Sequence, residues 1–356
     1  MPFIPETALE IDPVWLEEGL SAAFPGVRVR NVELLERHEV TNSHARISVD
    51  YRDAAGAPEI LFCKLLPTDP EHRAAIVATG MGLQEARFYE RLAPNVDIRV
   101  PEVHVARSDP ESGAFILVMQ DLVTTGCTVS DGAESVSVDA ASVALEDLAR
   151  LHVRFEDPAR RNAEAPWVQP PAPASDYGTV RLQYGLDHHR DRLTPAFATM
   201  AELYVAERDA LHAAWAEGPT TVIHGDAHIG NLFNDDGRVG FLDWGIIQAS
   251  TPLRDVGYFL CMSLSIEDRR AHERALWRHY LDARKAMGGA PVDWDEAWTA
   301  HRVHASYLAP ASCQIVTFPE VTNEPRQRFA DAFLARASAA IEDLEAHAAV
   351  SAAAGL

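Results

Sequence analysis

The sequence has few of the residues that mark disulfide-stapled, zinc-binding or nucleic-acid-binding proteins. Its four cysteines, at positions 63, 127, 261 and 313 of 356 residues, are far apart and indicate neither a disulfide framework nor a zinc site. Lysine and arginine total 31 against 53 acidic residues, a net charge of -22 that argues against nucleic acid as a partner. We therefore expect a protein of the reducing cytoplasm.

The sequence also lacks a segment suited to a membrane. The start MPFIPETALEIDP has no basic residues and no continuous apolar run, so we expect no signal peptide. The longest apolar stretch, around GYFLCMSL, is too short to cross a bilayer. With 47% hydrophobic residues, the chain is expected to be soluble and globular, with two domains or two lobes and no membrane partner. The sequence leaves the oligomeric state open.

The hydrophobic pattern changes character near residue 120. Before it, alternating apolar residues predict strands over 27–36, 44–51, 59–66, 100–107 and 113–122, with a helix over about 70–92. After it, helical periodicity dominates. This pattern predicts an α+β protein with a small antiparallel five-stranded sheet in an N-terminal lobe, 1–120, and a mostly helical C-terminal lobe, 121–356.

The most informative stretch is TVIHGDAHIGNLFNDDGRVGFLDWG, residues 221–245. Asp226 and Asn231 stand five apart, as in the catalytic loop of kinases, where an aspartate receives the hydroxyl proton and an asparagine helps to bind magnesium. Asp243 supplies a second metal ligand. We expect these side chains to gather around one Mg²⁺ ion and to transfer the γ-phosphoryl group of ATP to a hydroxyl.

Phosphoryl transfer also requires cations on the phosphates and a place for the nucleotide base. Lys64, in the strand EILFCKLL, is a candidate phosphate ligand, and Glu85 in the following helix is its candidate partner. Either residue alone is more often an ordinary surface charge. The segment ILVMQDL crosses between the lobes, and its backbone at Gln120 and Leu122 is a candidate for reading the adenine edge. A plain edge strand is the alternative.

A glycine-rich phosphate loop is missing. The segment HEVTNSHARI lies where protein kinases carry this loop, yet no glycine occurs between Gly26 and Gly56. Backbone amides and the side chains of Asn42 and Ser43 are candidates for capping the phosphates. A polar hairpin turn explains the same residues equally well.

The chain resembles the small-molecule kinases of the aminoglycoside phosphotransferase, choline kinase and ecdysteroid-kinase-like family. The resemblance covers nearly the whole length and rests on HGDAHIGN, FLDWGIIQASTPLRDVGYFL, LVMQDL, EARFYERL and LEDLARLHVRF. It implies a bilobal protein-kinase-like fold. It further implies that His224 holds the catalytic loop and that Asp255 braces the helix that follows it. The residues given above would act as catalytic base (Asp226), magnesium ligands (Asn231, Asp243) and phosphate-anchoring pair (Lys64, Glu85).

The sequence leaves the activity and the acceptor open. The motif His224-x-Asp226-x-His228 also fits a metal-dependent hydrolase, and a kinase-like fold can bind nucleotide without turnover. Trp244 follows the metal aspartate where protein kinases place phenylalanine, which suits a loop that does not switch. The acceptor is expected to be an aminoglycoside-, choline- or sterol-like alcohol. Trp294, Trp298 and Tyr307 recur at near-helical spacing as a candidate pocket wall, although such a stripe is more often part of the core.

Overall fold

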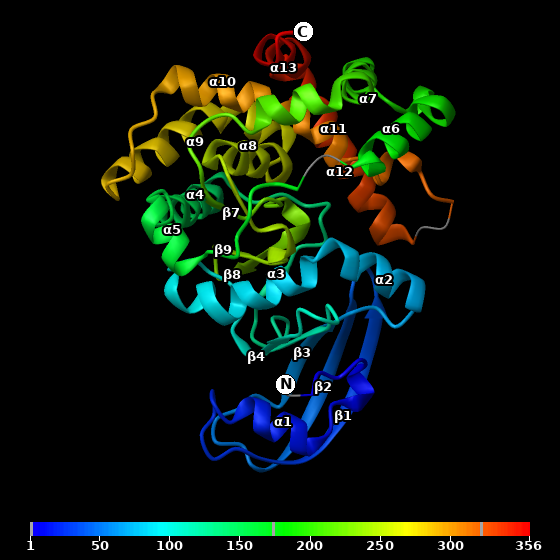
Figure 1. Cartoon of the computed structure of the whole chain (residues 1–356), viewed down its shortest axis with the longest axis vertical. Coiled ribbons are helices and arrows are strands. Elements are labelled where there is room, and N and C mark those ends of the chain that lie inside the picture. The colour runs from blue at the N-terminus through cyan, green and yellow to red at the C-terminus, as the bar shows by residue number, and fades with distance from the viewer. Residues whose placement is uncertain (1–2, 173–174, 321–322) are drawn as a thin grey trace. The chain divides into compact units, whose positions relative to one another are not determined.

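The computed structural model describes residues 3–172, 175–320 and 323–356. The chain forms two compact units (Figure 1). The first consists of Met1–Val129 together with Gly240–Ile247, and the second of Ser130–Val239 together with Gln248–Leu356. The short segment that carries Asp243 therefore belongs to the N-terminal unit, although it is distant in sequence.

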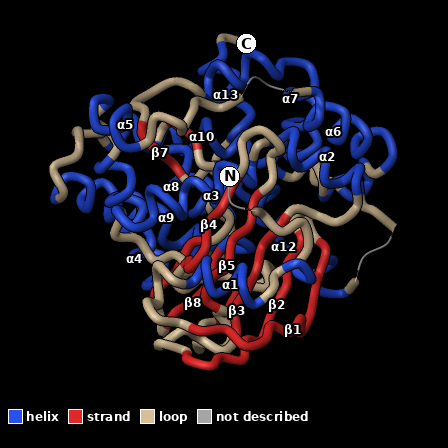
Figure 2. The backbone as a smooth tube through the Cα atoms, turned by 60° about the horizontal axis from the view of Figure 1, so that its bottom comes forward, coloured by secondary structure: helices blue, strands red, loops and turns tan. Residues whose placement is uncertain are grey.

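The first unit is built on a five-stranded antiparallel sheet, shown in red in Figure 2. Its strands follow the order β1-β2-β3-β5-β4, which confirms the predicted sheet. A helix precedes the sheet, and Asp12 caps it by accepting the backbone N–H of Trp15 at 2.8 Å. The elements of this unit include α1 (Pro13–Leu20), β1 (Arg28–Glu39), β2 (Ser43–Asp53), β3 (Ile60–Leu65), α2 (Pro70–Thr79), α3 (Met81–Arg87), β4 (Val103–Ser108), β5 (Phe115–Gln120) and β6 (Thr128–Val129).

The two faces of strand β3 have different surroundings. Leu61, Cys63 and Leu65 lie in one apolar cluster with residues of α1, so this face of the sheet is covered by that helix. Successive side chains of a strand point to opposite faces, and Lys64 therefore lies on the other face, where it pairs in register with Leu117 of β5. The alternation predicted from the sequence thus positions the lysine away from the α1 core.

The helix predicted over 70–92 is not continuous. It breaks at Gly80, whose left-handed φ of 70° ends α2 and precedes α3, and it finishes in a π-helical turn, Phe88–Leu92. Gly82 has a different purpose, because a Cβ atom there would lie 2.2 Å from the ring of Phe115. This glycine lets α3 pack closely on β5, and α3 carries Glu85.

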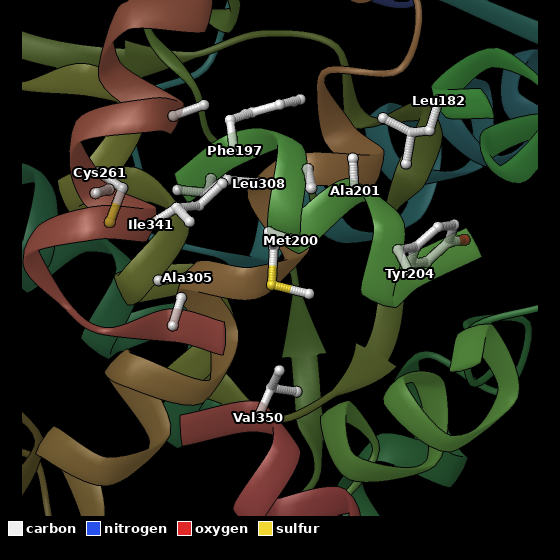
Figure 3. Packing of buried hydrophobic residues seen from close by; sticks show 14 of the residues in the cluster. Leu182, Phe197, Met200, Ala201, Tyr204, Cys261, Ala305, Leu308, Ile341 and Val350 are labelled. Carbon is white, nitrogen blue, oxygen red and sulfur yellow. The ribbon is translucent and has the colours of Figure 1, made fainter. Parts of the chain in front are cut away.

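The second unit is mostly helical, as predicted. One apolar cluster joins α7 to α11, α12 and α13, with Phe197, Met200, Leu308, Ile341 and Val350 among its members (Figure 3). The helices are α4 (Val138–Arg154), α5 (Pro158–Glu164), α6 (Asp176–His188), α7 (Pro195–Trp215), α8 (Pro252–Ser263), α9 (Ile266–Ala286), α10 (Trp294–His304), α11 (Leu308–Ala311), α12 (Glu324–Asp343) and α13 (Ala346–Ala354).

Short strands frame the catalytic stretch. β7 (Thr221–Ile223) enters it and pairs antiparallel with β10 (Gln248–Ser250), while β8 (Leu232–Asp235) and β9 (Arg238–Phe241) leave it as neighbouring strands. The loop between β7 and β8 therefore begins and ends at hydrogen-bonded strands. In the described part of the chain, no helix has both the length and the apolar character required to cross a bilayer.

The close packing at Gly82 predicts opposite effects for two glycine substitutions. Gly82→Ala is expected to lower the free energy of unfolding by about 1–3 kcal/mol, because the new methyl group overlaps the Phe115 ring. Gly178→Ala, in α6, meets its nearest atom at an ordinary 3.4 Å and is expected to be neutral or to stabilise by up to about 1 kcal/mol. Urea denaturation of both variants measures the difference; equal effects would contradict the close approach of α3.

Candidate active site

In the first unit, one lysine is held between two carboxylates. The Nζ atom of Lys64 lies 2.7 Å from Oε2 of Glu85 and 3.2 Å from Oδ1 of Asp243. Lys64 and Glu85 are buried, whereas the Asp243 side chain is 37% exposed. The structure therefore contains the Lys64–Glu85 ion pair that the sequence permits, and it adds Asp243 to the same cation.

Burial and charge act in opposite directions on this cluster. Burial disfavours the Lys64 ammonium, but Asp243 and Glu85 outweigh it and raise the pKa of Lys64 above its ordinary value. Burial also raises the pKa of Glu85 to about 7, although Lys64 favours the ionised carboxylate. The lysine thus remains a cation at neutral pH, as a ligand for phosphate oxygens must.

The backbone of the Asp243 loop is held in an uncommon conformation. Asp243 has φ 56° and ψ 70°, in the left-handed region, at a cost on the order of 1 kcal/mol. The next residue, Trp244, is fully buried and stacks on Phe88 with ring centroids 3.8 Å apart and planes 8° from parallel. This stack fixes the loop that presents Asp243 to Lys64.

In the second unit, both oxygens of the Asp226 carboxylate accept hydrogen bonds. Tyr258 Oη donates to Oδ1 at 3.1 Å, and Asn231 Nδ2 donates to Oδ2 at 3.1 Å. The same Nδ2 atom donates to the Asp226 carbonyl at 3.0 Å. Because two acceptors face this end of the Asn231 amide, its nitrogen lies there, and its oxygen is the atom left to bind a metal ion. The Asp226 side chain is 26% exposed, so a substrate can reach it.

The two histidines of the motif are bound through their Nδ1 atoms. His224 Nδ1 accepts the N–H of Asp226 at 3.2 Å, and His228 Nδ1 accepts the N–H of Gly230 at 3.0 Å. The neutral rings therefore carry their protons on Nε2, and binding a metal through Nε2 would require a tautomer that clashes with these donors. The described residues also contain no group of three or more His, Cys, Asp or Glu side chains arranged to hold a metal ion. This geometry disfavours the hydrolase alternative.

Asp255 supports the loop rather than only the helix that contains it. Its Oδ2 accepts the backbone N–H of His224 and its Oδ1 that of Gly225, both at 2.9 Å. Burial opposes the charge, yet hydrogen bonds from His152 and the backbone hold the pKa of Asp255 below its ordinary value. The carboxylate thus fixes the backbone just before Asp226, a contact that the sequence analysis did not predict, and its expected brace of the helix stays a prediction.

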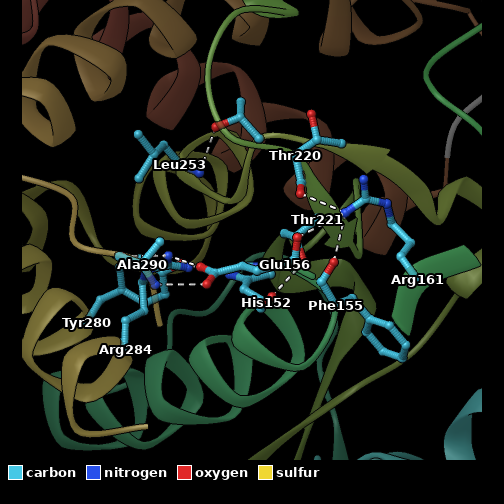
Figure 4. Close-up of polar contacts among 11 residues, drawn as sticks. His152, Phe155, Glu156, Arg161, Thr220, Thr221, Leu253, Tyr280, Arg284 and Ala290 are labelled. Atoms are coloured by element: carbon cyan, nitrogen blue, oxygen red, sulfur yellow. Dashed lines mark hydrogen bonds and ion pairs between the residues drawn. The ribbon is translucent and has the colours of Figure 1, made fainter. Parts of the chain in front are cut away.

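His152 continues this support into helices α4 and α9. Its Nε2 lies 3.2 Å from Asp255 Oδ2, and because a carboxylate only accepts, Nε2 carries the proton and Nδ1 accepts from Tyr280 Oη at 2.8 Å. Arg284 donates to Tyr280 Oη in turn and forms an ion pair with Glu156 (Figure 4). The backbone carbonyl of His152 accepts from Thr221, at the start of β7.

The sequence analysis did not assign His152, Tyr258 or Tyr280 a role. The helix LEDLARLHVRF contains His152, but no spacing relates it to a loop seventy residues later. Tyr258 did have a signal, since it stands three residues after Asp255 and shares its helix face. That face points to the catalytic loop only because the fold brings α8 there.

The predicted adenine-reading backbone is partly occupied. The N–H of Gln120 donates to the Glu102 carbonyl at 2.8 Å, and its side-chain oxygen accepts the Glu102 N–H at 2.8 Å. The carbonyl of Leu122 accepts the N–H of Cys127 at 2.9 Å. Backbone readout of the base therefore remains a prediction, with the N–H group of Gln120 already committed to the sheet.

Asn42 and Ser43 lie at the turn between β1 and β2. Both are buried, and the Asn42 carbonyl accepts the Val40 N–H at 3.0 Å, which closes the turn. The buried Oδ1 atom of Asn42 has no hydrogen-bond partner among the described residues. Ser43 pairs in register with Leu65 of β3, beside Lys64. Their role toward phosphate remains a prediction.

The aromatic residues suggested as a pocket wall lie in two different places. Trp294 and Trp298 stack on each other, and the guanidinium groups of Arg278 and Arg274 cover their rings at 4.4 and 4.0 Å. Tyr307 instead lies 5.9 Å from Tyr258, ring to ring. The tryptophan pair therefore already binds cations of the protein itself.

Comparison with known proteins shows the family of the chain. The model of the phosphotransferase enzyme family matches residues 70–297, which is more than half of the chain. The chain therefore belongs to the phosphotransferase enzyme family. An uncharacterized kinase-like protein from Caenorhabditis elegans is 23% identical over 185 residues. That match covers 47% of this chain and 47% of the relative, about half the length of each.

Solved structures share the kinase-like fold. A putative aminoglycoside phosphotransferase from Ralstonia eutropha matches with a TM-score of 0.50 and 14% identity, over 93% of this chain and 97% of that one. A choline kinase from Cryptosporidium parvum matches with a TM-score of 0.53 and 10% identity, over 89% and 91%. These matches confirm the predicted protein-kinase-like α+β fold.

Because the Asp255 carboxylate is buried, we expect even a conservative substitution there to lower the free energy of unfolding strongly. In Asp255→Asn, one carboxylate oxygen becomes an NH₂ group that faces a backbone or His152 N–H donor, so at least one buried donor loses its acceptor. We expect the free energy of unfolding to fall by about 2–3 kcal/mol. Asp209→Asn, whose side chain is 82% exposed, is the matched control and is expected to change it by less than about 1 kcal/mol. Similar losses in both variants would refute the bracing role.

Proposed function

We propose that this phosphotransferase moves the γ-phosphoryl group of Mg-ATP to a hydroxyl group of a small molecule. The observation that supports this most is the Asp226 carboxylate, which is partly exposed and has both oxygens held by donors. A proton acceptor fixed in this way, within reach of substrate, is what transfer to a hydroxyl requires.

The proposal assigns a role to each part of the site. Asp226 orients the acceptor hydroxyl and takes its proton as the oxygen–phosphorus bond forms and the bond to the leaving ADP oxygen breaks. Lys64, held by Glu85, binds phosphate oxygens. Asn231 and Asp243 would bind magnesium, since amide and carboxylate oxygens are ligands that this ion prefers. Magnesium, when bound, neutralises the charge on the transferred phosphate.

The acceptor is proposed to be an alcohol of the aminoglycoside, choline or sterol-like kind. The acidic balance of the chain is compatible with a cationic acceptor, and equally with a solvated surface. We also propose a cytoplasmic location. It is supported by four buried cysteines that are free thiols. A screen of nucleotide consumption with ATP and with GTP, over amino-sugars, choline-like alcohols, sugars and sterol-like alcohols, identifies the acceptor class.

Replacing the proposed base tests the chemistry directly. Asp226→Asn is expected to lower turnover by about 100- to 10,000-fold, because an amide cannot take the hydroxyl proton. Its affinity for Mg-ATP, measured by calorimetry, is expected to stay within about threefold of the wild type. Retained turnover would show that another group is the base. Mg-ATP binding without turnover in the wild type would favour a nucleotide-binding module.

Replacing Asp243, the proposed magnesium ligand, is expected to affect nucleotide binding rather than turnover alone. Asp243→Ala is expected to weaken Mg-ATP binding at least about tenfold, because it removes an anionic magnesium ligand. Affinity for ATP in EDTA should change less, since Lys64 keeps its partner Glu85. Asp50→Ala, at an exposed ion pair on β2, is the control in the same unit and should bind normally. An equal loss with and without magnesium would contradict the assignment.

A further inference from the structure

Tyr258 holds one oxygen of the proposed base. Its hydroxyl donates to Asp226 Oδ1 at 3.1 Å, while Asn231 holds Oδ2 from a different segment of the chain. Tyr258 comes from helix α8 and is 5% exposed, so its position is set by core packing rather than by solvent. Its ring belongs to the main apolar cluster of the second unit.

The phenol remains a hydrogen-bond donor at all ordinary pH values. Burial, followed by the negative charge of Asp226, raises the pKa of Tyr258 well above its ordinary value. Tyr258 therefore does not compete with Asp226 for the substrate proton. Two other polar side chains lie near Asp226 and Tyr258. His228 Nε2 lies 3.7 Å from Asp226 Oδ2. The Tyr307 ring lies 5.9 Å from that of Tyr258, and the Arg254 guanidinium lies over the Tyr307 ring at 4.0 Å.

Because Tyr258 and Asn231 each hold one oxygen of Asp226, the carboxylate cannot rotate as an untethered aspartate carboxylate does. The torsion that turns a carboxylate about its Cβ–Cγ bond has broad minima, so one donor alone leaves the second oxygen free to swing. With Tyr258 on Oδ1 and Asn231 on Oδ2, the carboxylate plane is fixed before substrate arrives. Each oxygen keeps a further lone pair for the hydroxyl proton.

We propose that Tyr258 is a positioning residue for phosphoryl transfer, which fixes the Asp226 carboxylate in the plane that accepts the substrate proton. This inference rests on the proposed function of Asp226. A misplacement of about 1 Å at a reacting group can cost on the order of 100-fold in rate, so the loss of one tether is expected to lower the turnover number rather than nucleotide binding.

Tyr258→Phe tests the inference because the ring and its packing remain. We expect kcat to fall on the order of tenfold, with KM for Mg-ATP within about twofold of the wild type. Turnover is measured with the acceptor found by the screen and, independently, as phosphate release from Mg-ATP with water as acceptor. Tyr204→Phe is the matched control, since it removes a buried hydroxyl that bonds His212 in the same apolar cluster. It should leave both constants unchanged.

A double-mutant cycle supplies a readout that is independent of turnover. Urea unfolding of the wild type, Tyr258→Phe, Asp226→Ala and the double variant should show that the two single effects do not combine independently, with a coupling on the order of threefold or more in the unfolding equilibrium constant. In turnover, Tyr258→Phe should add little to the loss already caused by Asp226→Asn.

The possible results distinguish the positioning role of Tyr258 from the proposed role of Asp226 as the base. An unchanged kcat in Tyr258→Phe, or independent effects in the unfolding cycle, overturns the positioning role while Asp226→Asn still tests the base. A parallel fall of kcat in Tyr204→Phe also overturns it, because any lost buried hydroxyl would then have the same effect. Full turnover in Asp226→Asn overturns the proposed base, and with it the need for a tether.

Discussion

The Asp255 carboxylate is the constraint on which the loop around Asp226 depends. It is almost fully buried, and its two oxygens satisfy two successive backbone N–H groups, those of His224 and Gly225. Buried backbone donors must find an acceptor, and here a charged side chain supplies it because the loop leaves β7 and forms no strand of its own. The residue that follows these two amides is Asp226, so the brace fixes the backbone from which the proposed base extends.

Asp255 and Asp226 carry the same carboxylate group, but their different surroundings determine what each can contact. Asp255 is enclosed by His152 and backbone amides, which leave no room for a substrate. Asp226 is tethered through both oxygens yet is partly exposed. In the first unit, the two carboxylates that contact Lys64 differ in the same way: Glu85 is buried, whereas the Asp243 side chain is partly exposed.

The sequence predicted the parts of this arrangement that depend on local order. The sheet strands alternate in period two, so the sheet could be predicted directly. The spacing of Asp226, Asn231 and Asp243 within one short stretch indicated a metal site in the same way, and that site stays a prediction. The break at Gly80 was missed because an isolated glycine is tolerated inside a helix and does not by itself mark the end of one. The His152–Asp255 contact joins residues 103 apart, and no periodicity encodes a separation of that length.

Helix α8 is where these constraints meet. Asp255 holds the backbone before Asp226, and Tyr258, three residues on and on the same face, holds the Asp226 side chain. Any shift of α8 moves both bonds together, so the helix must be fixed from its other side. Gly257 allows this, because a Cβ atom there would lie 3.1 Å from the His301 side chain of α10, which would have to give way by a few tenths of an ångström. The glycine in DVGYF is thus explained by packing rather than by chemistry, and it keeps α8 in the place from which Asp255 and Tyr258 reach the loop.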